Sequence, residues 1–499
     1  MGRIYYKNNV FDYDEAEHKT ILEILRDNMI YYDAPCGGNK TCGRCKIRIV
    51  YGNIVKGKEI QSISDEIVLA CDCIPFGDIK VMPLIGNENY AVETDFKKTV
   101  LVNPGEHYSG IGVAIDIGTT TLVLYFYNLD NGEIIAIQTA VNLQKSYGAD
   151  IMSRLKYHCS NKTLMNEIII TQINDIIAKT ASLYGFDPKD ISRITIAGNT
   201  VMEHFFGGID AEPIATAPYT PTSLFGIEQR AMNLGIKIAK NAVVYFAPCV
   251  SGFVGGDITA GMMSCNLDRT SDTILYLDIG TNGEIALAAK GRIFCCAAAA
   301  GPAFEGANIS CGMGAQSGAI STVYLNEKNE IQFSTINDVE PLGICGSGLV
   351  DAVAVGIKLS IIDETGRIQK GNSLKIAEKA VLTQKDIREV QLAKSAICAG
   401  ILTLMDFVGI SFEQIDEVLL AGGFGTRINP KSACAIGLIP NELSEKIRTI
   451  GNAAGSGAAE LLLKPEAEDR IQLLAEKCTY IELSENEFFK NEYITQMGF

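Results

Sequence analysis

Five cysteines near the start of the chain have the type and spacing of metal ligands. Cys36, Cys42 and Cys45 follow the pattern C-x5-C-x2-C in CGGNKTCGRC, and Cys71 and Cys73 follow in LACDC. Thiolates at such spacings bind either a structural zinc ion or an iron–sulfur cluster. The residues alone predict three ligands from the first group, and the fourth is Cys71 or Cys73.

The spacing favours a [2Fe-2S] cluster over zinc. Structural zinc sites usually pair two short C-x2-C knuckles, and this segment has one. Iron–sulfur ligation in ferredoxins uses a longer first loop, one C-x2-C and one distant cysteine. Gly37, Gly38 and Gly43 give the loop the backbone freedom to wrap a cluster and direct N–H groups at its sulfurs.

A second chemistry is indicated by two copies of Asp-Ile-Gly-Thr, which begin at Asp116 and Asp278. In each copy an apolar strand runs into a glycine turn, where successive N–H groups and threonine hydroxyls can converge on phosphate oxygens. An aspartate beside a phosphate requires a divalent cation between them, so we expect Mg²⁺. One such turn is a weak signal, but two at matching positions of a repeat predict a nucleotide site held from both sides.

A third glycine segment follows the apolar run IDEVLL. Its paired glycines, Gly422 and Gly423 in AGGFG, leave open backbone that suits stacking against an adenine or a ribose. Glu305 in GPAFEGAN is a candidate either for the nucleotide site or for a turn.

These residues need two kinds of domain to position them. In residues 1–86, strand-like GRIYY and KIRIVYG flank a helical face in KTILEILRDN, which predicts a small α+β domain. Residues 87–110 are polar and aperiodic and are interpreted as a linker. Residues 111–499 have an α/β pattern, including a helix that starts near Leu164 and ends at Gly185. The two Asp-Ile-Gly-Thr copies lie about 160 residues apart, which predicts two related lobes facing a cleft.

The composition limits the partners. The chain has 499 residues, 47% of them hydrophobic and 20% charged, with a net charge of −16. The acidic balance argues against a nucleic-acid partner, which would need a basic surface. The amino terminus lacks the apolar core of a signal peptide, and no apolar run reaches the roughly 18 residues of a membrane helix. We therefore expect a cytoplasmic protein without disulfides, although it has 15 cysteines.

The order of the three glycine motifs resembles the phosphate-1, phosphate-2 and adenosine motifs of the actin, Hsc70 and sugar-kinase superfamily. Over residues 111–499 this resemblance implies two ribonuclease-H-like lobes with ATP between them. It implies that Asp116 and Asp278 hold Mg²⁺ and the attacking water. The residues implied to line the nucleotide site are Gly118, Thr119, Thr120, Gly280, Thr281, Asn282, Gly283, Gly422, Gly423 and Phe424.

The cysteine loop resembles that of the β-grasp ferredoxins, in which the distant ligand follows Leu-Ala. This resemblance implies ligation by Cys36, Cys42, Cys45 and Cys71 rather than by Cys73. The first loop holds five residues, as in the adrenodoxin type.

An amino-terminal [2Fe-2S] domain joined to this ATPase fold resembles the reductive activators of corrinoid proteins. Further matching stretches include NLQKSYGADIMSRL, IAGNTVMEHFFGG, APCVSGFVGGDITAG, AGPAFEGANISCGMGAQSGAI, PLGICGSGLVDAVA and GNAAGSGAAELLL. The resemblance implies that ATP hydrolysis drives an electron from the cluster to a Co(II) corrinoid on a methyltransferase-system protein, restoring Co(I). It also implies a reductase or ferredoxin as the electron donor.

One departure from this family concerns its additional small domain, which members often carry between cluster and ATPase. Here about 45 residues separate Cys71 from Asp116, so that domain is expected to be missing. Three alternatives remain: an activator of another low-potential metalloenzyme, a redox-sensing chaperone-like ATPase, and a sugar or acid kinase with a structural zinc domain. A homodimer is left open.

Overall fold

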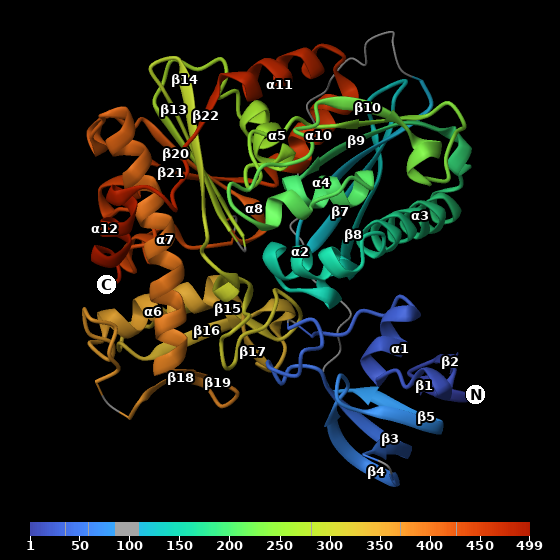
Figure 1. Cartoon of the computed structure of the whole chain (residues 1–499). Coiled ribbons are helices and arrows are strands. Elements are labelled where there is room, and N and C mark those ends of the chain that lie inside the picture. The colour runs from blue at the N-terminus through green and yellow to red at the C-terminus, as the bar shows by residue number, and fades with distance from the viewer. Residues whose placement is uncertain (35, 58, 85–108, 281, 370, 426) are drawn as a thin grey trace. The chain divides into compact units, whose positions relative to one another are not determined.

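The computed structural model describes the whole chain except residues 35, 58, 85–108, 281, 370 and 426 (Figure 1). The predicted linker therefore lies almost entirely outside the described residues, as does Thr281. The chain divides into two units. The first unit joins Met1–Asn89 to Val141–Gln172, and the second joins Tyr90–Ala140 to Ile173–Phe499.

The first unit contains a five-stranded sheet in the order β2-β1-β5-β3-β4, in which only the β1–β5 pair is parallel. Its strands are β1 (Gly2–Tyr6), β2 (Asn9–Tyr13), β3 (Lys46–Lys56), β4 (Glu59–Leu69) and β5 (Ile74–Pro83). The two strands predicted from GRIYY and KIRIVYG are β1 and the start of β3.

Helix α1 (Ile21–Asp27) lies within the segment that the sequence predicts to be helical. Thr20 and Glu23 form a capping box, with 2.7 Å from the Thr20 N–H to the Glu23 carboxylate and 3.3 Å from the Glu23 N–H to Thr20 Oγ1. The four predicted apolar residues are all buried in the core of this domain; they are Ile21, Leu22, Ile24 and Leu25. The unit also contains α2 (Ile151–Ser160).

The second unit is built on two six-stranded sheets. The first has the order β10-β11-β9-β6-β7-β8, with strands β6 (Ile111–Ile117), β7 (Thr121–Asn128), β8 (Ile134–Val141), β9 (Ile191–Gly198), β10 (Ile227–Arg230) and β11 (Val243–Phe246). The second has the order β21-β20-β12-β13-β14-β22, with strands β12 (Ile274–Ile279), β13 (Gly283–Ala289), β14 (Arg292–Ala298), β20 (Glu417–Ala421), β21 (Ile447–Gly451) and β22 (Cys478–Tyr480).

The two sheets repeat one pattern. β6 pairs antiparallel with β7 and parallel with β9, and β12 pairs antiparallel with β13 and parallel with β20. The two Asp-Ile-Gly-Thr copies therefore occupy equivalent positions, at the ends of β6 and β12. This confirms the duplicated α/β architecture expected from the sequence.

The helices from α3 onward lie on the two sheets, on the smaller sheets or on one another (Figure 1). They are α3 (Leu164–Tyr184), α4 (Thr200–Gly207), α5 (Gly256–Ser264), α6 (Gly346–Lys358), α7 (Gln384–Val408), α8 (Gly422–Gly425), α9 (Pro430–Ala435), α10 (Ala453–Leu463), α11 (Glu466–Lys477) and α12 (Glu487–Thr495). α5 and α10 pack together, and α10 also packs on β6 and β9, whereas α7 packs on β13 and β14. α3 ends at Gly185, whose φ is 76°, as predicted.

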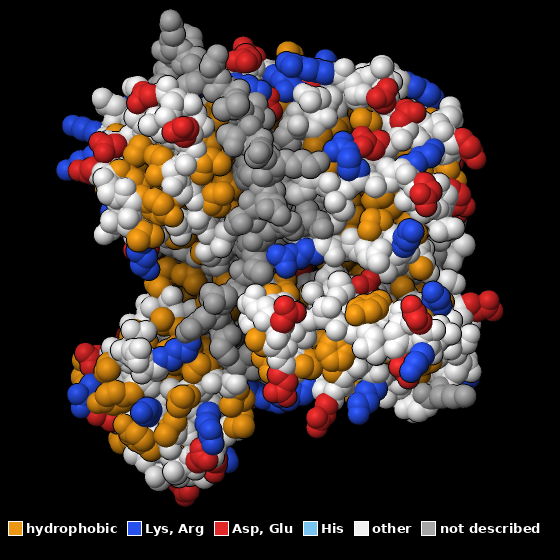
Figure 2. All heavy atoms as spheres, turned by 180° about the vertical axis from the view of Figure 1, so that it is seen from behind, with side chains coloured by type: hydrophobic (Ala, Val, Ile, Leu, Met, Phe, Trp, Pro, Cys, Tyr) orange, Lys and Arg blue, Asp and Glu red, His pale blue; other side chains and the backbone are white. Residues whose placement is uncertain are grey.

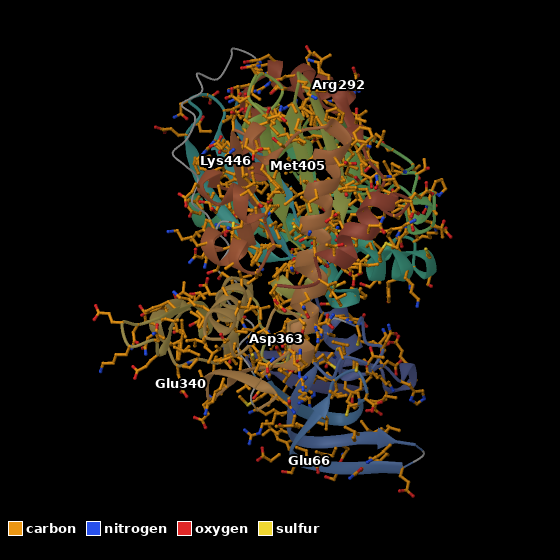
Figure 3. The ribbon with its side chains drawn as sticks, turned by 90° about the vertical axis from the view of Figure 1, so that its left-hand side faces the viewer. Glu66, Arg292, Glu340, Asp363, Met405 and Lys446 are labelled. Carbon is orange, nitrogen blue, oxygen red and sulfur yellow. The ribbon has the colours of Figure 1, made fainter. Side chains whose placement is uncertain are left out.

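Among the residues that the structure describes, one helix, α7, is long and apolar enough to cross a membrane by length and composition. In the fold, 78% of its most apolar window is buried, and Met405 near its end lies in the core of the second unit (Figure 3). It also carries the buried charged residues Asp386 and Lys394. These are the properties of a core helix in a globular domain.

Two small sheets complete the second unit. They contain β15 (Ala319–Leu325), β16 (Ile331–Thr335) and β17 (Gly343–Ile344), and β18 (Ser373–Ala377) and β19 (Ala380–Thr383). The turn before β20 is held by Lys446, whose ammonium donates to the carbonyls of Phe412 at 2.9 Å and Ile415 at 2.6 Å (Figure 3). Acidic and basic side chains are interspersed over the face drawn in Figure 2.

Candidate functional site

The structure brings the four predicted cluster ligands together as two pairs. The sulfurs of Cys36 and Cys42 lie 3.3 Å apart, and those of Cys45 and Cys71 lie 3.2 Å apart. Two thiolates on one tetrahedral metal ion with bonds of about 2.3 Å are roughly 3.8 Å apart, so each pair needs only a small separation to hold an ion. Cys73 is also buried, and the structure records no sulfur–sulfur contact for it among the described residues.

The glycines of the cysteine loop have the backbone angles that the sequence predicts. The backbone φ values of Gly37, Gly38 and Gly43 are 68°, 98° and 65°, and residues other than glycine rarely adopt such values. The loop is held from α1, where the Arg26 guanidinium donates to the Gly37 carbonyl at 3.1 Å. The loop can therefore turn its N–H groups inward.

The loop stabilises one sulfur as a thiolate. Burial alone would raise the pKa of the Cys36 thiol, but the backbone N–H groups of Cys42 and Thr41 outweigh burial and lower it to about 6. Burial raises the pKa of Cys71 to about 12 and that of Cys73 to about 11. Directed N–H groups are the feature by which iron–sulfur proteins stabilise cluster sulfurs.

The first phosphate turn joins β6 to β7. Asp116 lies near the end of β6, and the turn closes with a bond from the Gly118 N–H to the Thr121 carbonyl at 2.9 Å. Thr119 and Thr120 form the turn itself. The Thr120 hydroxyl donates to the Glu305 carboxylate at 2.7 Å, although the two residues are 185 positions apart.

The second phosphate turn joins β12 to β13 in the same way. Asp278 lies near the end of β12, and the Gly280 N–H donates to the Asn282 carbonyl at 2.8 Å. Gly283 begins β13. An added Cβ at Gly280 would lie 4.0 Å from a Glu305 carboxylate oxygen, so Glu305 lies close to both turns. The sequence placed Glu305 either in the site or in a turn, and it ends a short 3₁₀ turn while also contacting the site.

The AGGFG segment differs from its predicted form. It was expected to be an open turn, but Gly422–Gly425 form the short helix α8. Gly422 has a φ of 84°, and a side chain there would clash with the Asp278 carboxylate. A Cβ on Gly423 would meet nothing within 4 Å, so there is space beside this residue. The Phe424 ring stacks on Phe304, with centroids 5.0 Å apart.

Four carboxylates gather around the two turns. Burial raises the pKa of Asp116 to about 7 and that of Asp278 to about 6. Burial, together with the charges of Asp278 and Asp116, raises the pKa of Asp257 to about 8. Glu284 on β13 has a pKa well above its usual value for the same reasons. Mutual repulsion in a site of low polarity is relieved by protons or by a cation.

Two residues near the turns, Asp257 and Asn452, were not predicted from the sequence. Asp257 stands in the first turn of α5, in the quoted stretch VGGDITAG, and only the fold shows that it faces Asp116 and Asp278. Asn452 donates from its amide to Asp116 at 2.8 Å across 336 positions of sequence. No local pattern marks either residue, because their partners come from distant strands.

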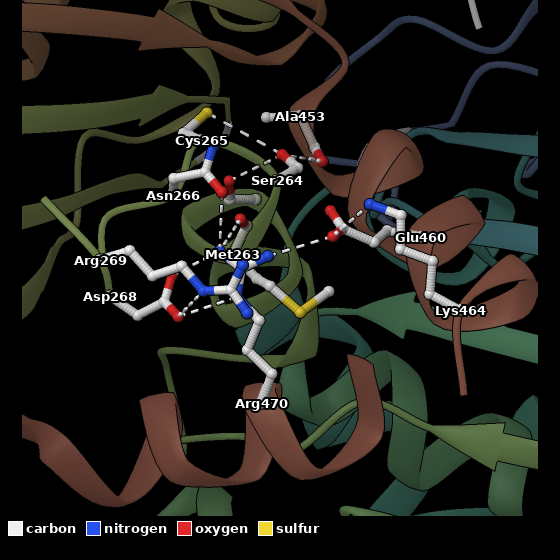
Figure 4. A network of polar contacts seen from close by, with 11 residues as sticks. Met263, Ser264, Cys265, Asn266, Asp268, Arg269, Ala453, Glu460, Lys464 and Arg470 are labelled. Atoms are coloured by element: carbon white, nitrogen blue, oxygen red, sulfur yellow. Dashed lines mark hydrogen bonds and ion pairs between the residues drawn. The ribbon is translucent and has the colours of Figure 1, made fainter. Parts of the chain in front are cut away.

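The helices that carry these two residues are fastened together by Arg470 of α11 (Figure 4). Its guanidinium donates to Asp268 at 2.8 Å and 2.6 Å, to Glu460 of α10 at 3.0 Å, and to the Met263 carbonyl of α5 at 3.0 Å. The side chains of Arg470 and Asp268 are only 8% and 9% exposed. The network therefore fixes α5 against α10.

His204, by contrast, has a structural role. It is fully buried on α4, its Nδ1 lies 2.7 Å from the Thr200 carbonyl, and its Nε2 accepts from the Ser223 N–H at 3.2 Å.

Three family profiles match the chain. They are the 2Fe-2S iron–sulfur cluster binding domain over residues 7–76, the RACo middle region over 111–270, and the C-terminal ASKHA domain of RACo over 272–499. The expectation that a middle domain is missing is therefore wrong, because the region that matches the RACo middle region spans residues 111–270 and includes the first Asp-Ile-Gly-Thr copy. The profiles assign an iron–sulfur cluster to the amino-terminal domain and ATP to the carboxy-terminal half.

Three known proteins are similar over most of the chain. The corrinoid activation enzyme RamQ of Eubacterium limosum is 32% identical over 78% of this chain and 70% of its own. The [Co(II) methylated amine-specific corrinoid protein] reductase of Methanosarcina barkeri is 25% identical over 78% of this chain and 77% of its own. The solved structure of a reductive activator for corrinoid, iron–sulfur protein is 28% identical, has a TM-score of 0.73, and covers 100% of this chain and 98% of that one. The chain therefore belongs to the family of reductive activators of corrinoid proteins.

Proposed function

We propose that this enzyme uses ATP to pass an electron from an amino-terminal [2Fe-2S] cluster to a Co(II) corrinoid on a protein of a methyltransferase system. The observation that carries the proposal is that one chain combines paired ferredoxin sulfurs with two equivalent carboxylate-bearing phosphate turns. One electron reduces Co(II) to Co(I), and an external reductase or ferredoxin resupplies that electron.

Cys36, Cys42, Cys45 and Cys71 are the proposed cluster ligands. The four sulfurs form two close pairs, Cys36 with Cys42 and Cys45 with Cys71. Two pairs suit two iron atoms better than one zinc ion, which would need all four sulfurs around it. This arrangement supports the [2Fe-2S] assignment.

Asp116 and Asp278 are the proposed Mg²⁺-holding and water-orienting residues. Their raised pKa values fit carboxylates that share a cation, and the fit extends to Asp257 beside them. When bound, the cluster supplies one-electron transfer, and Mg²⁺–ATP supplies the driving force for reducing an acceptor of low potential. The proposed nucleotide contacts are Gly118, Thr119, Thr120, Gly280, Thr281, Asn282, Gly283, Gly422, Gly423 and Phe424.

Residues of both glycine turns and of α8 are proposed to line the nucleotide site. Backbone N–H groups at the two glycine turns, with the hydroxyl groups of Thr119 and Thr120 in the first turn, are the proposed donors to phosphate oxygens. Gly422 leaves room for the Asp278 carboxylate, and there is space beside Gly423 where an added Cβ would meet nothing within 4 Å. Glu305 accepts from Thr120 and lies near Gly280, so it is placed to respond to a phosphate that binds either turn.

Three further assignments belong to the same proposal. The cluster domain comprises residues 1–86 and the ATPase residues 111–499, joined by a linker at 87–110. The protein is cytoplasmic, with no nucleic-acid or membrane partner. A homodimer is compatible with this function and is tested by light scattering of the holoprotein.

The test is spectroscopic. The protein is purified anaerobically and mixed with a Co(II) corrinoid protein, a reductant and Mg²⁺–ATP. The Co(I) absorbance band is expected only when both ATP and reductant are present. Reduction without ATP, or zinc in place of iron in the purified protein, would contradict the proposal.

A further inference from the structure

Asn452 is the residue at which the chain passes from one sheet of the second unit to the other. It follows β21, the edge strand of the second sheet, and precedes α10, which packs on β6 and β9 of the first sheet. Gly451 makes the turn, with a φ of 77°. A side chain at position 452 therefore reaches the first phosphate turn from the connection between the sheets.

Both the oxygen and the nitrogen of the Asn452 side-chain amide form hydrogen bonds. Its Oδ1 accepts from the Gly455 N–H at 2.8 Å and so caps α10. Its Nδ2 donates to Asp116 Oδ2 at 2.8 Å and to the Tyr125 hydroxyl oxygen at 3.2 Å. Because the cap needs an acceptor and the carboxylate needs a donor, one orientation of the amide satisfies both.

The residues around the Asn452 amide are closely packed. Tyr125 on β7 is fully buried, and an added Cβ at Gly455 would lie 2.7 Å from the Tyr125 ring and 3.0 Å from Asn452 Nδ2. A side chain at Gly457, two residues further along α10, would clash with the Ala260 backbone of α5. Glycines at these positions let α10 approach close enough for Asn452 to reach Asp116.

We propose that Asn452 is a positioning residue for ATP hydrolysis. Its amide orients the Asp116 carboxylate toward the Mg²⁺ of the bound nucleotide and ties that carboxylate to the turn between the two sheets. The inference rests on the proposed role of Asp116, and it adds a residue that acts through Asp116 rather than on the nucleotide itself.

The test separates positioning from helix capping. Asn452→Ser keeps an oxygen that can cap α10 but removes the amide donor to Asp116. Asn429→Ser is the matched control, because Asn429 caps α9 by accepting from the Lys431 N–H at 3.0 Å. Tyr125→Phe removes the second partner of the amide while leaving its bond to Asp116.

ATP affinity of the full-length holoprotein is measured by calorimetry with Mg²⁺ and with a chelator. For Asn452→Ser the gain in affinity that Mg²⁺ provides should fall about tenfold, which corresponds to the loss of one charge-assisted hydrogen bond of about 1.4 kcal/mol. Affinity in chelator should stay as in the parent. ATP turnover should show a reduced kcat, and Asn429→Ser and Tyr125→Phe should show neither change.

Two outcomes overturn the inference. One is an unchanged Mg²⁺-dependent gain in Asn452→Ser, and the other is an equal loss in Asn429→Ser. Asp116→Asn distinguishes this failure from that of the proposed function. If Asp116→Asn keeps the full Mg²⁺-dependent gain, the assignment of Asp116 itself is wrong. If Asp116→Asn loses the gain while Asn452→Ser keeps it, only the positioning role is wrong.

Discussion

At the scale of single residues, the proposed fourth cluster ligand is Cys71, and the alternative is Cys73. Cys71 lies 3.2 Å from Cys45, whereas Cys73 is buried without a recorded sulfur neighbour among the described residues. We expect Cys71→Ser to lose most of the bound iron and the visible absorbance of the cluster, and Cys73→Ser to keep both. Iron analysis and absorption spectra of anaerobically purified variants measure this. Equal loss in both variants would show that burial, not ligation, explains the effect.

The raised carboxylate pKa values predict a pH dependence of stability. An aspartate has an ordinary pKa of about 3.9, and Asp257 is raised to about 8, so the folded protein holds this proton where the unfolded chain has lost it. The stability that Asp257 contributes is fully present below about pH 4 and is lost as the pH rises toward 8. When a chelator removes Mg²⁺, the free energy of unfolding falls by at most about 1.4 kcal/mol per pH unit because of Asp257.

Asp257→Asn removes this dependence and isolates it from other groups. Asp116, raised to about 7, contributes to the same slope only below that pH. Between pH 7 and 8 the thermal unfolding midpoint of the parent should therefore fall relative to that of Asp257→Asn, and Mg²⁺–ATP should reduce the difference. A difference that stays constant from pH 6 to 8 would contradict the raised pKa of Asp257.

At the scale of elements, the sequence predicted the parts whose signals are local. The apolar face of α1 and both glycine turns are marked by neighbouring residues, and the structure has them at the predicted positions. α8 was missed because Gly422 is required by the approach of Asp278, a residue from another strand. Asp257 and Asn452 were missed for the same reason. The sequence therefore predicts the site residues that lie within one glycine turn, but not those that distant parts of the chain bring to the site.

The α5–α10 pair gives a prediction at this scale. Arg470→Met leaves Asp268 and Glu460 without the buried cation between them, and an unpaired buried charge costs about 3–5 kcal/mol. Lys464→Met is the matched control, since Lys464 contacts the same Glu460 at 3.0 Å from a more exposed position and should cost under about 1 kcal/mol. Thermal unfolding of both variants measures the contrast. Similar losses would mean that Arg470 does not fasten the two helices.

At the scale of the whole molecule, the cluster domain and the ATPase have separate cores, so one can be disabled while the other stays intact. Asp278→Ala removes a carboxylate from the second phosphate turn and touches nothing in the cysteine loop. We expect it to abolish ATP-driven reduction of the Co(II) corrinoid protein while the absorbance of its own cluster stays unchanged. Anaerobic spectra of both species in one cuvette measure the two effects together. If reduction persists at the parent rate, the second phosphate turn is not the ATPase site; if the cluster absorbance is lost too, the two domains depend on each other for folding.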